Sequence, residues 1–106
     1  MNKSSVTSNG LVNVNSNLKW NELLNFEDKL VLIVDDEKDL RKIISYNLEQ
    51  EGIKTIEASD GDKAINALNQ NPSLIILDIM MPGKDGYEVC KIIRDSGNTV
   101  PIVFLT

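Results

Sequence analysis

Three aspartates stand at places in the sequence where carboxylates could gather into a reactive site. Asp35 and Asp36 directly follow the apolar run 30–34 (LVLIV), and Asp78 follows the apolar run 74–77 (LIIL). Such runs are typical of strands that are covered on both faces of a parallel sheet. Because the carboxyl ends of parallel strands meet at one edge of the sheet, we expect the three carboxylates to lie within a few ångströms of one another.

A cluster of three carboxylates needs something to offset its charge. Like charges about 4 Å apart repel by on the order of 4 kcal/mol per pair at an effective dielectric of 20. A hard divalent cation or protonation of one acid could offset this repulsion. The chain has no histidine and one cysteine, and an all-oxygen ligand set favours Mg²⁺. A carboxylate beside Mg²⁺ can act as a nucleophile towards a phosphoryl group, so Asp78 is a candidate phosphoacceptor. The competing interpretation is that these acids cap helices or lie in solvated loops.

The elements that would position the aspartates alternate along the chain. Apolar runs predict strands at 29–34, 53–58, 74–77 and 101–106, the second of them at an edge of the sheet. Helical spacing predicts three helices between them. The first is expected to be capped by Asp36 or Asp39 and to end before Gly52, and the others span about 61–69 and 86–94. This order predicts a parallel α/β sheet with helices on both faces.

Apolar positions at helical spacing show which helix faces should be buried. The first helix carries a stripe of four such residues and the third a stripe of three. These residues are Leu40, Ile43, Ile44 and Leu48 in the first helix, and Val89, Ile92 and Ile93 in the third.

Composition limits the classes of function. A chain of 106 residues with 42% apolar and 25% charged residues is expected to form one ordinary globular domain. A net charge of −5 argues against direct nucleic-acid binding. Cys90 permits no internal disulfide, and we expect it to be a helix residue near the core. No apolar run is long enough for a membrane span and no secretory pattern is present. We therefore expect a cytoplasmic location, in a bacterial cytosol or inside an organelle.

Residues 1–28 are expected to form an N-terminal tail before the domain at 29–106. The first 17 residues are rich in Asn and Ser and show no sustained period. Between 18 and 26, Trp20, Leu23 and Leu24 would share one side of a short helix. So short a helix would hold only if it were docked on the domain. A loosely ordered linker is the other interpretation.

Three motifs give the chain a resemblance to a known family. Residues 31–37 (VLIVDDE), 77–86 (LDIMMPGKDG) and 101–106 (PIVFLT) resemble the receiver domain of two-component response regulators in order and approximate spacing. The resemblance covers 29–106. It implies a flavodoxin-like, doubly wound parallel sheet with four strands in the order 2-1-3-4 and three helices here. A complete receiver domain has a fifth strand and the order 2-1-3-4-5.

The resemblance also implies roles for individual residues. Asp78 matches the phosphoacceptor, Asp36 a direct Mg²⁺ ligand and Asp35 a ligand through water. Met80 matches a ligand through its backbone carbonyl, and Thr106 matches the switch hydroxyl. The resemblance implies a phosphohistidine on a sensor histidine kinase or phosphotransfer protein as the phosphoryl donor.

The loop after Asp78 is part of the same motif. The loop is rich in residues that favour turns, and among them Pro82 and Gly86 match the family's pattern.

The sequence departs from the family after Thr106. A receiver domain continues into a helix, a strand bearing an invariant lysine, and a final helix. No lysine here matches that one, and Lys84 lies in the loop after Asp78. The loss of one charge-assisted contact of about 1.5–3 kcal/mol predicts weakened phosphotransfer and dephosphorylation. Without the final helix, we expect exposed apolar area on one face of the first and third strands, which could support self-association.

Two other functional interpretations compete with phosphoacceptor signalling. A pseudo-receiver fragment would keep this part of the fold and act as a protein interaction module that is not switched. A phosphatase of the haloacid dehalogenase type is disfavoured, because it would need Asp-x-Asp after its first strand, and this chain has adjacent aspartates followed by Glu37.

The sole tryptophan separates the two interpretations of residues 18–26. Docking on the domain predicts that Trp20 fluoresces at short wavelength in the folded protein and shifts to long wavelength on unfolding, because docking removes the indole from water. Fluorescence spectra recorded across a urea titration test this. A solvent-exposed spectrum under native conditions would contradict docking.

Overall fold

The structure is a computed structural model that describes residues 29–105. The expected tail at 1–28, its segment 18–26 and the expected switch residue Thr106 lie outside the described residues. The division of the chain at residues 28 and 29 therefore stays a prediction.

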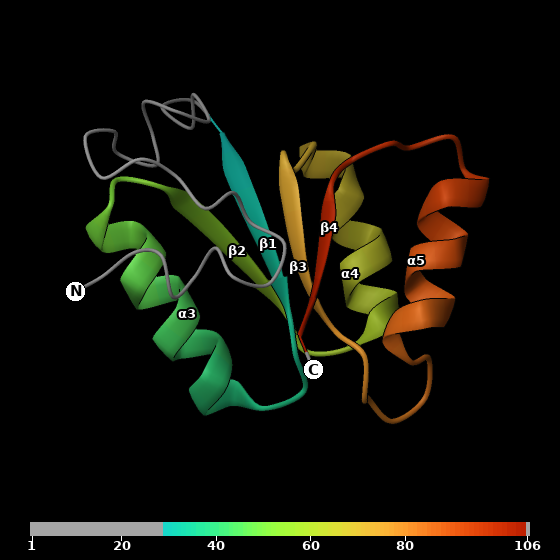
Figure 1. The fold of residues 1–106 in the computed structure, drawn as a ribbon, viewed down its shortest axis with the longest axis horizontal. Coiled ribbons are helices and arrows are strands. Elements are labelled where there is room, and N and C mark those ends of the chain that lie inside the picture. Colours follow the sequence, from blue (N-terminus) through green and yellow to red (C-terminus); the bar gives the residue numbers. More distant parts are fainter. Residues whose placement is uncertain (1–28, 106) are drawn as a thin grey trace.

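One four-stranded parallel sheet lies between layers of helices, as the sequence predicts (Figure 1). The strand order is β2-β1-β3-β4, and every neighbouring pair is parallel. This confirms the flavodoxin-like arrangement of four strands and three helices. The elements are β1 (Leu30–Val34), α3 (Lys38–Gln50), β2 (Lys54–Ala58), α4 (Gly61–Ala67), a 3-10 helix (Leu68–Gln70), β3 (Leu74–Asp78), α5 (Gly86–Asp95) and β4 (Ile102–Leu105).

The two central strands form the buried middle of the sheet. In β1, residues 31–34 are completely buried, and in β3 the four residues before Asp78 are buried. The register pairs Val34 with Leu77. Asp35 and Asp78 are the next residues along each strand, so the pairing itself brings them out at the same edge of the sheet.

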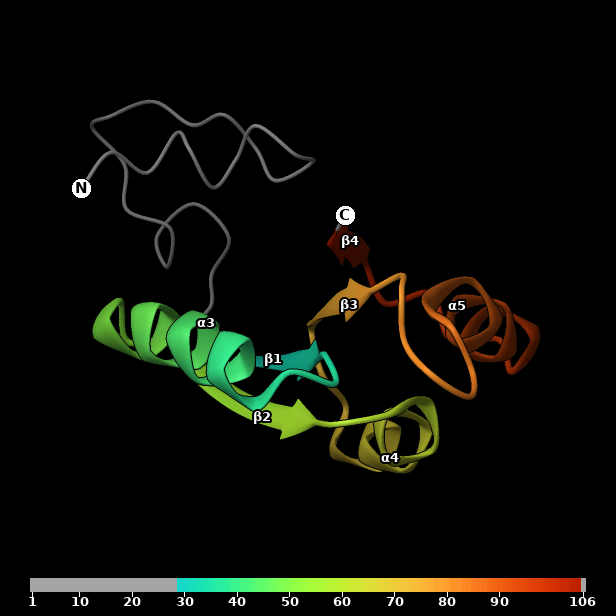
Figure 2. The same ribbon diagram turned by 90° about the horizontal axis from the view of Figure 1, so that it is seen from below.

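Helix α3 covers the sheet on the side opposite α4 and α5 (Figure 2). Its N-cap residue is Glu37, whose side chain makes no capping hydrogen bond. The prediction that Asp36 or Asp39 caps this helix was therefore wrong, because the helix begins between them. Its other end follows the prediction: Gly52 has a φ of +81°, and its N–H donates to the Glu49 carbonyl, as expected of a glycine that ends a helix.

Helices α4 and α5 cover the opposite face over one large apolar cluster. Both begin at aspartate caps: Asp60 accepts from the Lys63 N–H, and Asp85 forms a capping box with Glu88. Cys90 packs against this cluster, as predicted.

Some members of the predicted apolar stripes face solvent instead of the core. Ile43 is 58% exposed, and Leu40 and Ile92 are each 36% exposed. Helical spacing alone was misleading here because α3 and α5 each contact the sheet along a narrower strip than the stripes suggested. Ile44, Val89 and Ile93 do pack into the core.

The face beside α3 is less exposed than the sequence suggested. We expected open apolar area on the first and third strands, but Val31 and Ile33 are completely buried and Leu74 and Ile76 are each 7% exposed. The prediction was wrong for these side chains because residues of α3 and β4 pack against them. Those covering residues are Ile44, Leu48, Val103 and Leu105.

Among the helices in the described range, the longest has 13 residues, and none could cross a lipid bilayer.

Gly86 brings the start of α5 close to the end of β3. A methyl group at this position would collide with the Asp78 carbonyl oxygen and lie 2.7 Å from the Ile79 Cα. Helix propensity alone predicts that Gly86→Ala stabilises the protein by about 1 kcal/mol. We expect instead a loss of roughly 1–3 kcal/mol, because backbone atoms must move. Urea unfolding followed by circular dichroism measures the change.

Gly61→Ala is the matched control for this substitution. Gly61 also opens a helix, but the atoms nearest to an added methyl group belong to the side chains of Val89 and Lys84. Side chains yield more readily than backbone, so we expect a smaller cost. Stabilisation by Gly86→Ala would contradict the packing argument.

Candidate functional site

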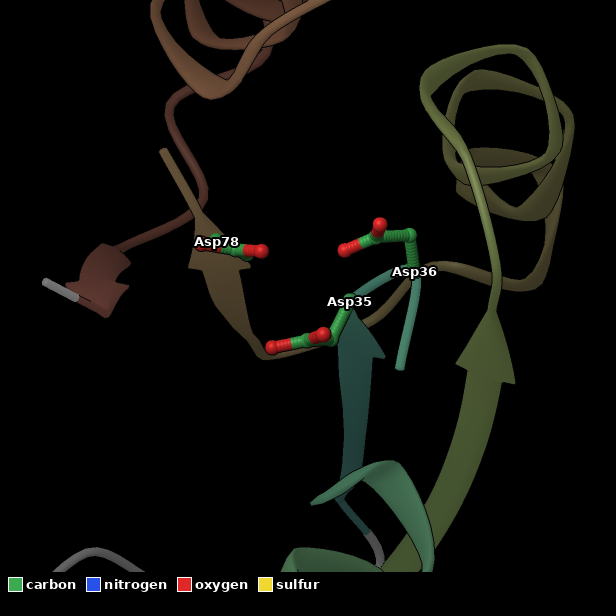
Figure 3. A group of neighbouring side chains, drawn as sticks. All are labelled: Asp35, Asp36 and Asp78. Carbon is green, nitrogen blue, oxygen red and sulfur yellow. The ribbon is translucent and has the colours of Figure 1, made fainter. Parts of the chain in front are cut away.

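The three predicted aspartates meet at the carboxyl ends of β1 and β3 (Figure 3). One carboxylate oxygen from each of Asp35, Asp36 and Asp78 lies within 4.8 Å of the other two. Asp36 and Asp78 point towards each other across the space between the two strand ends. Asp35 is 2% exposed, whereas Asp36 is exposed to solvent. The structure thus places together the acidic residues that the sequence analysis selected.

Backbone hydrogen bonds shape the Asp35–Asp36 turn. The Asp35 N–H donates to the Ala58 carbonyl on β2 at 3.2 Å. The Glu37 N–H donates to the Asp35 carboxylate at 2.8 Å. The buried carboxylate of Asp35 therefore accepts one hydrogen bond from the loop backbone through Oδ1.

The loop after Asp78 folds back onto the end of β3. The Met80 N–H donates to the Asp78 carboxylate at 3.1 Å, and the Gly86 N–H donates to the Ile79 carbonyl at 2.9 Å. The Met80 side chain is 80% exposed. Of the other predicted loop residues, Pro82 is exposed and Met81 is buried in the core. The loop therefore holds Met80 beside Asp78 through backbone atoms.

The electrostatic cost of the cluster is visible at Asp78. Burial raises the pKa of its carboxyl above the ordinary value of 3.8, and the negative charges of Asp35 and Asp36 raise this pKa further. The Met80 N–H lowers the same pKa by stabilising the ionised form. Repulsion and burial together outweigh the single hydrogen bond. The fold therefore opposes the ionisation of Asp78.

The ligand set fits a hard cation. All three side chains offer carboxylate oxygens, which Mg²⁺ prefers. None of the ion pairs among residues 29–105 includes Asp35, Asp36 or Asp78. Within the described part of the chain, the negative charge of the cluster is therefore not neutralised by a lysine or arginine side chain.

The described lysine nearest in sequence to Asp78 has another partner. Lys84 Nζ donates to Asp62 Oδ1 at the start of α4, at 2.9 Å, and this ion pair raises the pKa of Lys84. The expectation that Lys84 does not take the place of the family's lysine stays a prediction. The ion pair instead ties the loop to α4.

One functional candidate was missed in the sequence. Arg41, in the first turn of α3, donates to the carbonyl oxygen of Asp35 at 2.7 Å. It also pairs with Glu57 on β2 at 3.1 Å. A sequence signal existed, since an arginine follows the acidic pair by about one helical turn. Nothing in the sequence, however, indicated that Glu57 would orient it.

The sequence of this chain matches a known protein family. The sequence model of the response regulator receiver domain matches residues 31–106. The alkaline phosphatase synthesis transcriptional regulatory protein PhoP of Bacillus subtilis is 45% identical over 80 residues, a match that covers 74% of this chain and 33% of PhoP. The chain spans about a third of the length of the curated relatives that it matches.

Solved structures match the fold as well. A structure of histidine kinase ThkA in complex with response regulator protein TrrA matches with a TM-score of 0.68 and 38% identity, covering 74% of this chain and 68% of the matched chain. TrrA from Thermotoga maritima in complex with Mg²⁺ and BeF matches with a TM-score of 0.61 and 39% identity, covering 64% of this chain and 60% of that one.

The raised pKa of Asp78 predicts how stability depends on pH in a metal-chelating buffer. The folded state binds the Asp78 proton more tightly than the unfolded state, so stability falls as pH rises from about 3.8 through the folded-state pKa. Asp78→Asn keeps an acceptor for the Met80 N–H and removes the charge. It should raise the free energy of unfolding at pH 7, and this gain should disappear near pH 3.8.

Asp62→Asn is the control in the same urea titrations. Asp62 is an exposed aspartate that pairs with Lys84, so its neutralisation should not stabilise the protein at pH 7. An Asp78→Asn variant that is no more stable than wild type at pH 7 would contradict the electrostatic argument.

Proposed function

Because this chain belongs to the response regulator receiver domain family of two-component systems, we propose that it accepts a phosphoryl group on Asp78. The observation that carries the proposal is the placement of Asp78 at the end of β3, with oxygens of Asp35 and Asp36 within 4.8 Å. Asp78 is partly exposed and can be reached by a donor. Its two acidic neighbours supply ligands for a cation that would neutralise the incoming phosphoryl group.

The proposed reaction is a phosphoryl transfer between two side chains. An oxygen of ionised Asp78 attacks phosphorus and forms a new P–O bond, while the P–N bond of the donor phosphohistidine breaks. The electron pair of that bond stays on the imidazole nitrogen, which takes up a proton from solvent. The Met80 N–H stabilises the attacking carboxylate in its ionised form. Most of the work is therefore positioning and charge compensation.

Mg²⁺ is the cofactor that these residues would hold. Asp35, Asp36 and Asp78 would supply carboxylate oxygens, and Met80 its backbone carbonyl. When bound, Mg²⁺ would offset the negative charge that gathers on the phosphoryl oxygens. The complex of TrrA with Mg²⁺ and BeF supports this assignment. The chain's own contribution is the arrangement of the ligands before the ion arrives.

The proposed donor is a sensor histidine kinase or a phosphotransfer protein. The chain has no histidine and so cannot supply the phosphohistidine itself. The match to the complex of histidine kinase ThkA with TrrA supports a kinase partner.

Other expectations remain predictions. These are the switch role of Thr106, a cytoplasmic location, self-association through the sheet face of the first and third strands, and the absence of direct nucleic-acid binding.

Phosphorylation can be read as a mass change. The purified chain, incubated with Mg²⁺ and a small acyl phosphate donor, should gain the mass of one phosphoryl group, and peptide mapping should place it at Asp78. Asp78→Asn should gain none. Asp62→Asn, which neutralises an exposed aspartate of the neighbouring helix, should react like wild type. Intact-mass spectrometry at short reaction times gives the readout.

A second comparison defines the result that would contradict the proposal. A version of the chain extended by a family helix-strand-helix segment serves as the comparison. Phosphorylation of the extended version, with none of the chain itself, would overturn the proposal for this chain.

A further inference from the structure

Arg41 connects the acidic cluster to the edge strand of the sheet. Its Nη1 donates to the carbonyl oxygen of Asp35 at 2.7 Å, and its Nε lies 3.1 Å from Oε1 of Glu57. The side chains of Arg41 and Glu57 are only 13% and 21% exposed. One guanidinium therefore joins the start of α3, the end of β1 and strand β2.

The carbonyl that Arg41 holds belongs to the peptide unit between Asp35 and Asp36. Because a peptide unit is planar, a contact that fixes its oxygen also limits where the Asp36 Cα can lie. From the other side, the Asp35 N–H is bound to the Ala58 carbonyl of β2 at 3.2 Å. The backbone that leads into Asp36 is thus held on both sides of Asp35. These contacts restrict the position of the Asp36 Cα, from which the exposed Asp36 side chain extends.

Charge and position predict opposite effects of Arg41 on a bound cation. As a positive charge near the cluster, Arg41 would repel a cation, and its removal would strengthen cation binding. As a support for Asp36, it would keep a ligand in place, and its removal would weaken binding. Residues that orient metal ligands typically change affinity by 10–100-fold when they are replaced. The sign of the change therefore separates the two roles.

We propose that Arg41, oriented by Glu57, is a positioning residue that holds Asp36 in place for a divalent cation bound with Asp35 and Asp78. This inference rests on the proposed function, because it needs the acidic cluster to bind a cation. It adds a requirement for two residues, Arg41 and Glu57, that offer no ligand to the ion.

Lys42 provides a matched control. Its Nζ pairs with the same carboxylate, at 3.1 Å from Oε2 of Glu57. Lys42 carries the same charge as Arg41 and is the next residue in the helix, but its side chain is 61% exposed. Its Nζ hydrogen bond goes to Glu57 and not to the Asp35 carbonyl. Lys42→Gln therefore removes one positive charge from this corner and leaves the Asp35 contact intact.

The test is Mg²⁺ titration of the full chain by calorimetry, at fixed pH and ionic strength. We expect Arg41→Gln to weaken Mg²⁺ binding roughly 10-fold relative to wild type, and Lys42→Gln to bind as tightly as wild type or slightly more tightly. Glu57→Gln should weaken binding less than Arg41→Gln. The variant that combines Arg41→Gln with Glu57→Gln should bind Mg²⁺ no more weakly than Arg41→Gln alone, since both changes act through one contact.

Hydrogen exchange adds a readout that does not depend on the metal. The Glu37 N–H donates to the Asp35 carboxylate at 2.8 Å. In metal-free protein, this N–H should exchange faster in Arg41→Gln than in wild type, and at the wild-type rate in Lys42→Gln. Should Arg41→Gln fail to fold in urea titrations, Arg41→Lys replaces it. That variant keeps the charge but loses one of the two contacts of the guanidinium, and should also bind Mg²⁺ more weakly.

The outcomes distinguish the inference from the function on which it rests. If wild type does not bind Mg²⁺, both the proposed cofactor and the inference are overturned. If wild type binds Mg²⁺ and Arg41→Gln binds it as tightly or more tightly, the inference alone is overturned.

Discussion

Repulsion among three carboxylates is the constraint on which the rest of this structure depends. Oxygens of Asp35, Asp36 and Asp78 lie within 4.8 Å of one another, and each pair of charges at such a distance costs on the order of several kcal/mol at an effective dielectric of 20. Burial raises the pKa of Asp78, and the charges of Asp35 and Asp36 raise it further. Only a fold with stability to spare elsewhere can hold such a cluster together.

The sheet supplies that stability. The central strands β1 and β3 are buried on both faces and paired in register, with Val34 beside Leu77. The next residue of each strand is an aspartate, so the hydrophobic core and the acidic site are parts of one pairing. Close packing of Gly86 against the end of β3 adds a second restraint, because it fixes where the loop after Asp78 returns to the domain. The acidic cluster therefore lies directly beside the buried core, at one edge of the sheet.

Backbone N–H groups of the loops and the side chain of Arg41 restrain the acidic cluster without neutralising its charge. N–H groups of Glu37 and Met80 each satisfy one carboxylate oxygen. Arg41 is directed to a backbone carbonyl and to Glu57, not to the aspartates themselves. An ion pair between Arg41 and the cluster would remove the charge that attracts a divalent cation. Among residues 29–105, the observed contacts instead leave the negative charge of the cluster without a lysine or arginine partner.

The sequence by itself determined the strand and helix order, the parallel sheet and the three acidic residues. It could do so because apolar runs of strand length ending in aspartate are local patterns with one compatible arrangement in a parallel sheet. Its errors were of a different kind. The capping residue of α3 and the exposure of Ile43 and Ile92 depend on where each helix meets the sheet, which periodicity does not specify.

Only the tertiary structure decided how the site is supported. The contact of Arg41 with both Asp35 and Glu57 joins residues that are 6 and 16 positions apart in the chain. The burial of Leu74 and Ile76 likewise depends on side chains from α3 and β4. A local pattern carries the chemistry of each side chain, but the partner of a charge and the cover of a strand are set by distant segments that meet only when the chain folds.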